Sequence, residues 1–156
     1  MHVCYYPSPI GTLAIITDAH SVWQITPNDD NNRQTLLPKE SALIHQLTVR
    51  LQAYFQGEMV NFQDIPLATR GTPFQQQVWQ ALTQIPYGKH STYGELARSI
   101  NRPQAARAVG AAVGANPWMV ILPCHRVLGL GNYLTGYRWG LASKRKLLEL
   151  ENIRYR

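Results

Sequence analysis

The chain changes character at residues 68–73, where the short turn-forming sequence ATRGTP separates two halves with different patterns. Before this segment, β-branched and aromatic runs alternate with turn residues, and after it apolar residues recur at helical spacing. A chain of 156 residues is long enough for one domain or for two small ones. We therefore predict an α/β domain over residues 1–67, a linker over 68–72 and a mainly helical domain over 73–156.

The first half contains three predicted strands and one predicted helix. The strands cover residues 2–6, 12–17 and 22–25, and a polar loop, NDDNNRQ, follows at residues 28–34. The helix is indicated by four apolar residues at helical spacing, Leu43, Leu47, Leu51 and Tyr54. Gly57 supplies its end. This order is typical of a small α/β unit.

The second half begins with a predicted helix that Thr72 can cap and Pro73 can open. One face of this helix is apolar and consists of Phe74, Val78, Leu82 and Ile85. The sequence PYG at residues 86–88 is expected to end it.

Two short helices joined by a tight turn then suggest a helix-turn-helix motif. Thr92 and Glu95 form the capping box of the first, which runs to residue 100, and the second covers roughly residues 104–114. The second helix contains AARAVGAAVG, so Arg107 stands among small residues that let a helix approach a surface closely. Packing against the protein's own core is the alternative, but Arg107 and the basic second half favour contact with DNA.

Basic residues are concentrated in this second half. Residues 1–71 carry four Lys/Arg against six Asp/Glu, a net charge of −2, whereas residues 72–156 carry eleven against three, a net charge of +8. The two charges add up to the +6 of the whole chain. A solvated surface and a polyanionic partner both explain such an excess, so the motifs have to decide between them.

The composition, with 45% hydrophobic residues, is that of a folded globular protein. The two cysteines, Cys4 and Cys124, cannot build a disulfide framework, and no metal site is expected because no cysteine or histidine cluster has ligand spacing. The sequence shows no signal peptide and no apolar run near the roughly 20 residues of a membrane span. We therefore expect a soluble cytoplasmic protein with reduced thiols, and Cys4 as a buried strand residue.

Cys124 stands directly before His125 in the sequence PCHRV. A thiol with a free pKa of about 8.5 is mostly protonated at neutral pH, so a nucleophilic cysteine needs a nearby base or cation. His125 can be that base, and a carboxylate would orient it. Since neighbouring residues of an extended segment point to opposite faces, a water or a backbone bend must connect the two side chains. A buried structural cysteine is the alternative.

The motifs around these residues resemble those of the O6-alkylguanine-DNA alkyltransferases, also called methylated-DNA:protein-cysteine methyltransferases. In order along the chain, these motifs are GTPFQQQVW, TYGELA, AARAVG, ANP, PCHRV and LTGYRWGLASKRKLLELE. These motifs span residues 71–151 in the family's order, and the first half also has the family's order of elements. The resemblance is therefore highly specific.

The resemblance implies an RNase H-like N-terminal domain of the α/β class and a mainly α C-terminal domain with a winged helix-turn-helix. It implies a monomer that binds the minor groove of double-stranded DNA containing O6-alkylguanine, with O4-alkylthymine as a second candidate substrate. The damaged base rotates out of the stack into a pocket. Arg107 would fill the vacated space, and Ala106 and Tyr93 would be further DNA contacts.

The same resemblance implies the reaction. Cys124 attacks the alkyl carbon, His125 takes the thiol proton through a water, and Glu151 orients the imidazole. Tyr93 assists the departure of guanine, and Asn116 steadies the turn between the second helix and the active-site strand. Because the thioether product has no good leaving group, each molecule reacts once, and no cofactor is implied.

The expected pocket includes both family-like and unusual residues. The backbone carbonyls of Cys124 and Val127 would accept hydrogen bonds from the guanine amino group, and Tyr137 would form one wall. The sequence TGYRWG departs from the commonest pattern of the family, which often has small residues where this chain has Arg138 and Trp139. The range of alkyl groups that this pocket accepts is therefore not given by the resemblance.

Three other classes of function fit the motifs less well than alkyl transfer does. A noncatalytic alkyltransferase-like damage sensor would share the helix-turn-helix but lack the cysteine that PCHR retains. A transcriptional regulator would need base-reading polar side chains on its second helix, where Ala, Val and Gly predominate. A cysteine hydrolase would need an oxyanion hole, for which no motif is evident. DNA repair by alkyl transfer is therefore the prediction.

Overall fold

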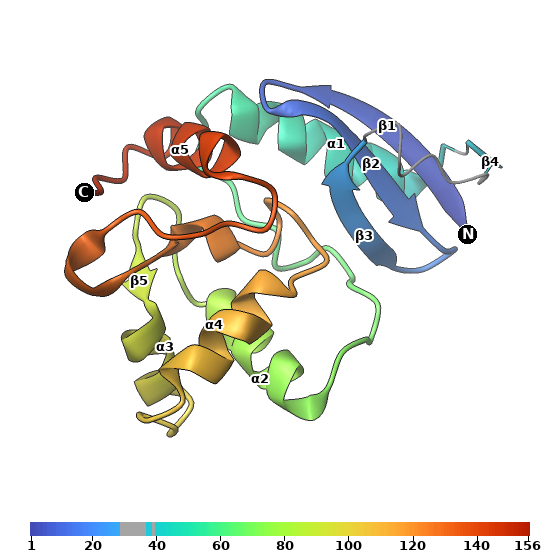
Figure 1. The fold of residues 1–156 in the computed structure, drawn as a ribbon. Coiled ribbons are helices and arrows are strands. Elements are labelled where there is room, and N and C mark those ends of the chain that lie inside the picture. Colours follow the sequence, from blue (N-terminus) through green and yellow to red (C-terminus); the bar gives the residue numbers. More distant parts are fainter. Residues whose placement is uncertain (29–36, 39) are drawn as a thin grey trace. The chain divides into compact units, whose positions relative to one another are not determined.

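The computed structural model describes residues 1–28, 37–38 and 40–156, so most of the predicted polar loop at 28–34 lies outside the described residues. The chain divides into two compact units (Figure 1). The first comprises Met1–Thr69 and Pro117–Met119, and the second comprises Arg70–Asn116 and Val120–Arg156. The domain limits expected from the sequence stay a prediction.

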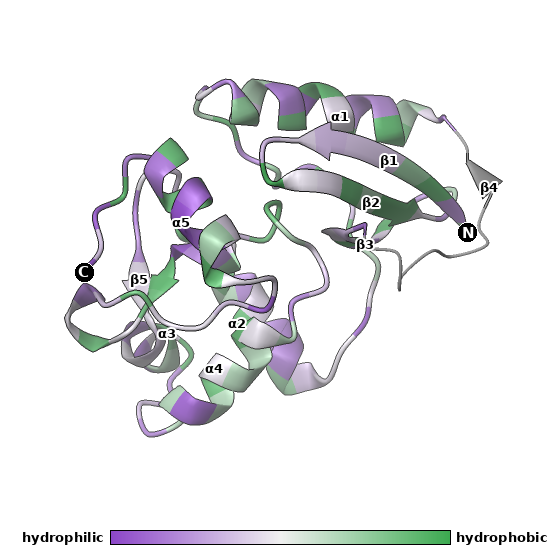
Figure 2. Cartoon of the chain, turned by 45° about the horizontal axis from the view of Figure 1, so that its top comes forward, coloured by the Kyte–Doolittle hydropathy of each residue, from purple (hydrophilic) through white to green (hydrophobic). Residues whose placement is uncertain are grey.

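The first unit contains a sheet with the strand order β3-β2-β1-β4. β1 (His2–Ser8) pairs antiparallel with β2 (Gly11–Thr17), which pairs antiparallel with β3 (Val22–Pro27). These elements confirm the three predicted strands, whereas the short β4 (Leu37–Pro38), parallel to β1, was not predicted. The last five residues of β2 are all buried, and this hydrophobic stretch is green in Figure 2.

α1 (Ala42–Phe55) is the predicted helix of the first unit. Its N-terminus is capped by the Ser41 hydroxyl, which accepts a hydrogen bond from the Ile44 backbone N–H at 3.2 Å. The buried stripe begins at Ile44, because Leu43 is only half-buried, and it continues with Leu47, Leu51 and Tyr54. Gly57 follows the helix with a φ of 89°, a left-handed conformation that glycine adopts without strain.

The segment Pro117–Met119 belongs to the first unit through its contacts with β3. The Ile25 backbone N–H donates to the Pro117 carbonyl at 2.9 Å, and the Met119 N–H donates to the Ile25 carbonyl at 3.1 Å. The Trp118 indole N–H donates to the Val22 carbonyl at 2.9 Å. These bonds satisfy polar groups at the edge of β3.

The second unit begins with α2 (Pro73–Leu82). Thr72 and Gln75 form a full capping box, and Pro73 occupies the first turn as predicted. The helix ends at Leu82, before the predicted end of its apolar face at Ile85. The physical reason is Pro86, because the residue before a proline avoids the helical conformation.

The next two helices form the predicted helix-turn-helix. α3 (Tyr93–Ser99) has the predicted capping box of Thr92 and Glu95, and α4 (Ala106–Gly114) starts two residues later than predicted. Asn101 lies in the turn between them with a φ of 60°. Both helices pack against each other, and the Trp79 indole of α2 donates to a carbonyl of α4 at 2.8 Å.

The last part of the second unit consists of short strands and a final helix. β5 (Ser91–Thr92) pairs parallel with β6 (Val127–Leu128), which places the start of α3 beside the residues that follow Cys124. α5 (Leu141–Leu150) closes the unit. No helix of the described chain is both long and apolar enough to cross a membrane.

Candidate active site

Cys124 lies in a tight backbone turn rather than in the extended strand expected from the sequence. Pro123 has φ and ψ of −81° and 58°, and the Cys124 N–H donates to the Leu122 carbonyl at 2.7 Å, which is the geometry of an inverse γ-turn. A 3₁₀ turn then covers Cys124–Arg126. This bend prevents the strand-like alternation of Cys124 and His125, and the cysteine side chain is only 3% exposed.

Asn116 connects the end of α4 to this turn, which agrees with the position expected for it. Its side-chain N–H₂ donates to the Leu122 carbonyl at 3.1 Å and to the Cys124 sulfur at 3.1 Å. The side chain is fully buried. A donor on sulfur favours the thiolate, so Asn116 both fixes the turn and stabilises the charge of a nucleophile.

A buried network of charged groups surrounds the neighbouring histidine. His125 Nε2 lies 2.5 Å from one Glu151 carboxylate oxygen, and the other oxygen accepts from Arg126 Nε at 2.8 Å and from the Gly88 N–H at 3.1 Å. Arg126 also donates to the Ile85 carbonyl at 2.6 Å. The expected pairing of His125 with Glu151 is therefore present, and Arg126 is an additional member that the sequence reasoning missed.

Burial shifts the pKa values of both Cys124 and His125. Desolvation raises the pKa of the Cys124 thiol, while hydrogen bonds from Asn116 and Tyr137 and the charge of Lys144 oppose that rise. Desolvation lowers the pKa of His125, although Glu151 favours its charged form. In the resting site, Cys124 is therefore a protonated thiol and His125 a neutral imidazole. The thiol can donate a proton, and the imidazole can accept it.

Lys144 of α5 is a second functional candidate that the sequence reasoning missed. Its ammonium group is fully buried and donates to the carbonyls of Val127, Thr135 and Gly136 at 2.7, 3.2 and 3.4 Å. Burial lowers its pKa from 10.5 to about 8. A signal was available in the sequence, because Lys144 shares a helical face with the buried Leu147 and Leu148.

Cys124 opens onto a pocket of about 250 Å³ in the second unit. Its lining residues come from α3, α4, the cysteine turn and the loop before α5: Tyr93, Gly110, Val113, Gly114, Cys124, Gly136, Tyr137 and Arg138. The Tyr93 hydroxyl lies 3.2 Å from the Thr135 hydroxyl, which fixes its position at the rim. The glycines of α4 leave room in the pocket where larger side chains would fill it.

Two predicted pocket residues do not line this pocket. Val127 is fully buried, and its carbonyl is engaged by Lys144. Trp139 packs its ring edge-on against Tyr137, with ring centroids 5.5 Å apart, and the Arg138 guanidinium lies 5.3 Å from the centre of the Trp139 ring. Trp139 therefore supports the residues of the pocket wall from behind.

The predicted DNA contacts Arg107 and Ala106 occupy the first turn of α4. Arg107 is exposed, and Ala106 is half-buried. Later residues of the same helix, Gly110, Val113 and Gly114, line the pocket. One short helix thus carries both an exposed arginine and a wall of the cysteine pocket.

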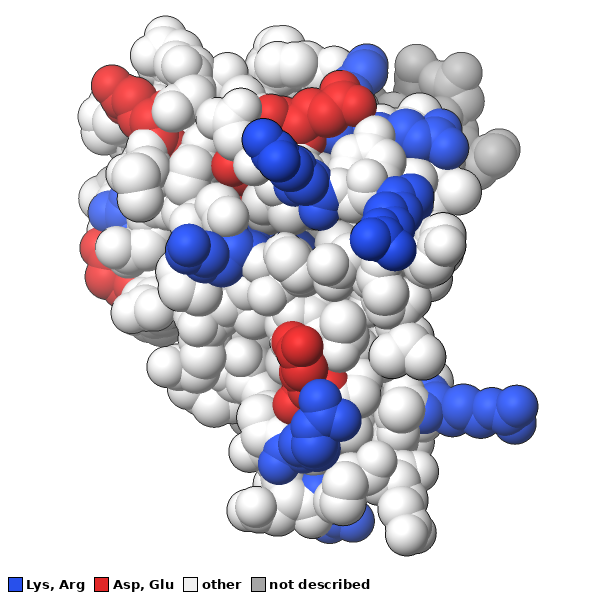
Figure 3. Space-filling model, turned by 90° about the vertical axis from the view of Figure 1, so that its left-hand side faces the viewer, with Lys and Arg blue, Asp and Glu red and all other residues white. Residues whose placement is uncertain are grey.

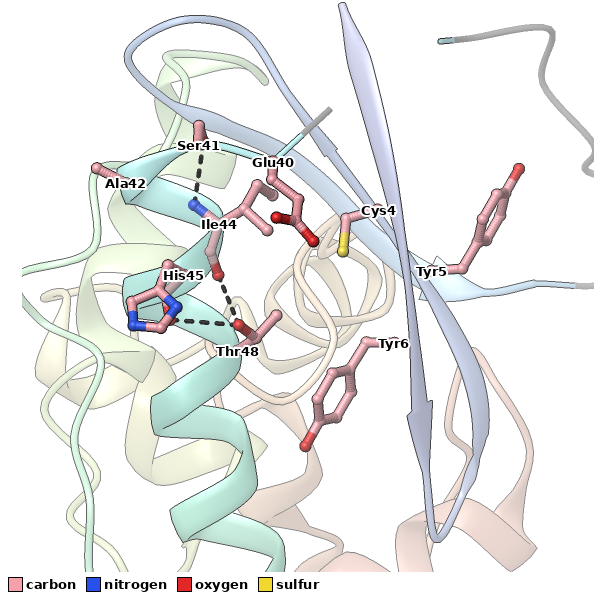
Figure 4. A pocket seen from close by; sticks show the side chains of 9 residues that line it. All are labelled: Cys4, Tyr5, Tyr6, Glu40, Ser41, Ala42, Ile44, His45 and Thr48. Carbon is pink, nitrogen blue, oxygen red and sulfur yellow. Dashed lines mark hydrogen bonds between the residues drawn. The ribbon is translucent and has the colours of Figure 1, made fainter. Parts of the chain in front are cut away.

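Cys4 has surroundings different from those of Cys124. It is a half-buried residue of β1 rather than the buried one expected, and it lines a pocket of about 640 Å³ beside the start of α1 (Figure 4). Burial and the charge of Glu40 both raise the pKa of the Cys4 thiol. Nothing among its described neighbours favours a thiolate there, in contrast to Cys124.

Basic side chains are spread over the surface shown in Figure 3. Lysines and arginines lie at several separate places on this face, with acidic side chains between some of them. The basic side chains on this face therefore do not form a single continuous patch.

Two models of known domains match the chain. The ribonuclease-like domain of 6-O-methylguanine DNA methyltransferase matches residues 1–69, and the DNA binding domain of the same protein matches residues 73–153. A methylated-DNA–protein-cysteine methyltransferase of Haemophilus influenzae is 47% identical over an alignment of 162 positions, which covers 99% of this chain and 88% of the relative. A protein of the same name from Methanosarcina acetivorans is 40% identical, with 97% and 98% covered.

Solved structures are similar as well. The crystal structure of Mycobacterium tuberculosis OGT in complex with DNA has a TM-score of 0.88 and 44% sequence identity, and the match covers 97% of this chain and 92% of that one. A crystal structure of the M. tuberculosis O6-methylguanine methyltransferase has a TM-score of 0.86 at 44% identity.

Proposed function

Because this chain belongs to the 6-O-methylguanine DNA methyltransferase family, we propose that it repairs DNA by moving the alkyl group of O6-alkylguanine onto Cys124. Membership confirms the predicted fold class, a ribonuclease-like domain followed by a DNA-binding domain. It also confirms the predicted activity, that of a methylated-DNA–protein-cysteine methyltransferase with DNA as its partner.

The observation that carries the choice of acceptor is the position of Cys124. Its sulfur borders the 250 Å³ pocket and accepts a hydrogen bond from Asn116. The sulfur forms a bond to the alkyl carbon while the bond from that carbon to O6 breaks, and the electron pair of the broken bond returns to the guanine. The thiol loses one proton and the guanine gains one at N1, so the exchange balances. The thioether does not release the alkyl group, and each molecule reacts once.

His125 takes up the thiol proton in this scheme. Since Nε2 is held by Glu151 at 2.5 Å, the ring nitrogen that exchanges a proton with Cys124 through a water is Nδ1. Burial keeps the imidazole neutral and therefore able to accept a proton. Glu151 then stabilises the imidazolium, and Arg126 holds the carboxylate in place.

The pocket is proposed to receive the flipped base. Tyr93 and Tyr137 offer flat walls, and the glycines of α4 allow this helix to approach the minor groove closely. Arg107, exposed on the same helix, would fill the gap that the guanine leaves in the duplex. One chain supplies the whole site in this arrangement, so we propose that the protein acts as a monomer.

The test compares two cysteine variants in the repair of duplex DNA that contains O6-methylguanine. Cys124→Ser should leave the O6-methylguanine content of the DNA unchanged while still binding the duplex, because a serine hydroxyl has a far higher pKa than a thiol. Cys4→Ser is the matched control and should repair at the wild-type rate. Repair by Cys124→Ser, or its loss in Cys4→Ser alone, would refute the assignment.

A further inference from the structure

Arg138 joins the two walls of the Cys124 pocket. Its guanidinium NH1 donates to the Asn116 carbonyl at 2.9 Å and lies 3.4 Å from the Ala115 carbonyl, at the C-terminal end of α4. The guanidinium also lies over the Trp139 ring, 5.3 Å from its centre. Arg138 is thus held between a helix end and an aromatic face, both of which stabilise a cation.

The same residue, Asn116, links this cation to the nucleophile. Its carbonyl accepts from Arg138, and its side-chain amide donates to the Cys124 sulfur at 3.1 Å. A group attached to the carbon that Cys124 attacks therefore lies in a pocket bordered by the arginine. None of the residues that line this pocket is acidic, and the buried Lys144 ammonium, which donates to the carbonyl of the lining residue Gly136 at 3.4 Å, adds a second positive charge beside it.

An arginine offers five N–H donors in a planar fork that fits a carboxylate. The contacts described for Arg138 employ only NH1, and within residues 1–28, 37–38 and 40–156 no carboxylate forms an ion pair with it. We propose that Arg138 is a specificity-determining residue that favours O6 substituents ending in a carboxylate over neutral substituents of the same size. This inference rests on the proposed function, with Cys124 as the acceptor.

The transfer itself is unchanged for such a substrate. With O6-carboxymethylguanine, the Cys124 sulfur forms a bond to the CH₂ carbon, the bond from that carbon to O6 breaks, and guanine leaves with the electron pair. The carboxylate takes no part in the bond changes. It binds Arg138 before and during the displacement, which raises the rate of transfer relative to a neutral substrate.

The experiment uses duplexes that carry O6-carboxymethylguanine or O6-carbamoylmethylguanine, which differ only in carboxylate against amide. The rate of alkyl transfer to the intact protein is measured with each duplex. The ratio of the two rates is the readout, because general effects on folding or DNA binding cancel in this ratio. We expect Arg138→Gln to lower the ratio of carboxymethyl to carbamoylmethyl transfer about three- to tenfold, the size of one partly exposed charge-assisted hydrogen bond. Arg138→Lys should keep part of the preference.

Arg145→Gln is the matched control, because it removes one exposed arginine of the same unit that does not line the pocket. Its ratio should equal that of the wild type. A second readout needs no variant: raising the salt concentration should lower the wild-type ratio, since screening weakens an exposed ion pair. The proposal would be overturned if Arg138→Gln had the same ratio of carboxymethyl to carbamoylmethyl transfer as the wild type, even if both transfers were slower. It would also be overturned if the wild-type ratio did not depend on salt.

A duplex with O6-methylguanine is included to separate the two levels of inference. If the wild-type protein never acquires the methyl group, the proposed function fails. If methyl transfer proceeds and the ratio does not depend on Arg138, only the specificity role fails.

Discussion

At the scale of single residues, buried charge is concentrated in the two residues after Cys124 and in α5 with its C-terminal Glu151, which packs against the turn of Cys124. Among the described residues, those that bear a buried ionic side chain or a buried imidazole are His125, Arg126, Lys144 and Glu151. Burying such groups is costly unless each is paired, and each of these has a charged or carbonyl partner within hydrogen-bond distance. Their arrangement around Cys124 is best explained by the chemistry of the thiol.

Glu151 allows a direct test of this network. Glu151→Gln keeps the shape but leaves Arg126 without its anionic partner, so we expect a loss of roughly 3–5 kcal/mol in the free energy of unfolding. The weaker partner of His125 should also slow methyl transfer by about ten- to a hundredfold. Glu149→Gln, on the exposed side of α5, is the control and should change neither quantity. Normal transfer by a folded Glu151→Gln protein would argue against the proposed proton route.

Lys144 predicts a particular dependence of stability on pH. Its pKa is about 8 in the folded protein against 10.5 as its ordinary value, so between these values the unfolded chain binds more protons. The contribution of this group to the free energy of unfolding therefore rises with pH. The difference in this free energy between wild type and Lys144→Met should grow in favour of wild type by roughly 2 kcal/mol from pH 7 to pH 9.5.

Urea denaturation of both proteins at several pH values measures this difference. A difference that stays constant over the range would mean that the buried ammonium has an ordinary pKa in the folded protein.

Individual residues also show where sequence reasoning reaches its limit. Cys124 and His125 are adjacent in the sequence, so their chemistry could be read directly. The pairing of His125 with Glu151 followed only from the family resemblance, because 26 positions separate the two residues. The roles of Arg126 and Lys144 depend on carbonyls contributed by distant segments, and no local pattern encodes those contacts.

At the scale of elements, α4 combines two tasks on one short helix. Its first turn exposes Arg107, and its later glycines border the cysteine pocket. The capping signals of α2 and α3 and the small residues of α4 could be predicted, since they act over a few neighbouring positions. The turn at Cys124 could not, because the Asn116 side chain that fixes it lies six residues before Leu122 and eight before Cys124, beyond the reach of local capping and turn signals.

Arg107→Ala separates base extrusion from chemistry. If Arg107 fills the space of the flipped guanine, its loss makes extrusion from duplex DNA costlier by about 1–3 kcal/mol, and duplex repair slows correspondingly. A free base such as O6-benzylguanine needs no extrusion, so its reaction with Cys124 should change little. Equal losses on both substrates would assign Arg107 to the support of the fold instead, and the melting temperature of the variant would show that directly.

At the scale of the whole molecule, the two halves differ in charge, with −2 over residues 1–71 and +8 over residues 72–156. The sequence established this asymmetry, but it could not show where basic side chains lie on the surface. On the face shown in Figure 3, the lysines and arginines of the chain lie at several separate places. Dispersed basic groups still bind DNA through its phosphates, with release of counterions.

Binding of undamaged duplex should therefore weaken steeply with salt. For about four phosphate contacts, the affinity should fall about a hundredfold between 50 and 200 mM monovalent salt. Fluorescence anisotropy with a labelled duplex measures this slope. An affinity that stays flat across the titration would contradict binding through the basic half.

The most direct test of the central claim is the intact mass of the wild-type protein after incubation with excess duplex containing O6-methylguanine, followed by peptide mapping. The account predicts that each chain gains one methyl group and no more, and that the methyl group lies on the peptide containing Cys124. An unchanged mass would identify a damage sensor rather than a catalyst. A methyl group on Cys4, or continued repair by chains that already carry one, would contradict single transfer to Cys124.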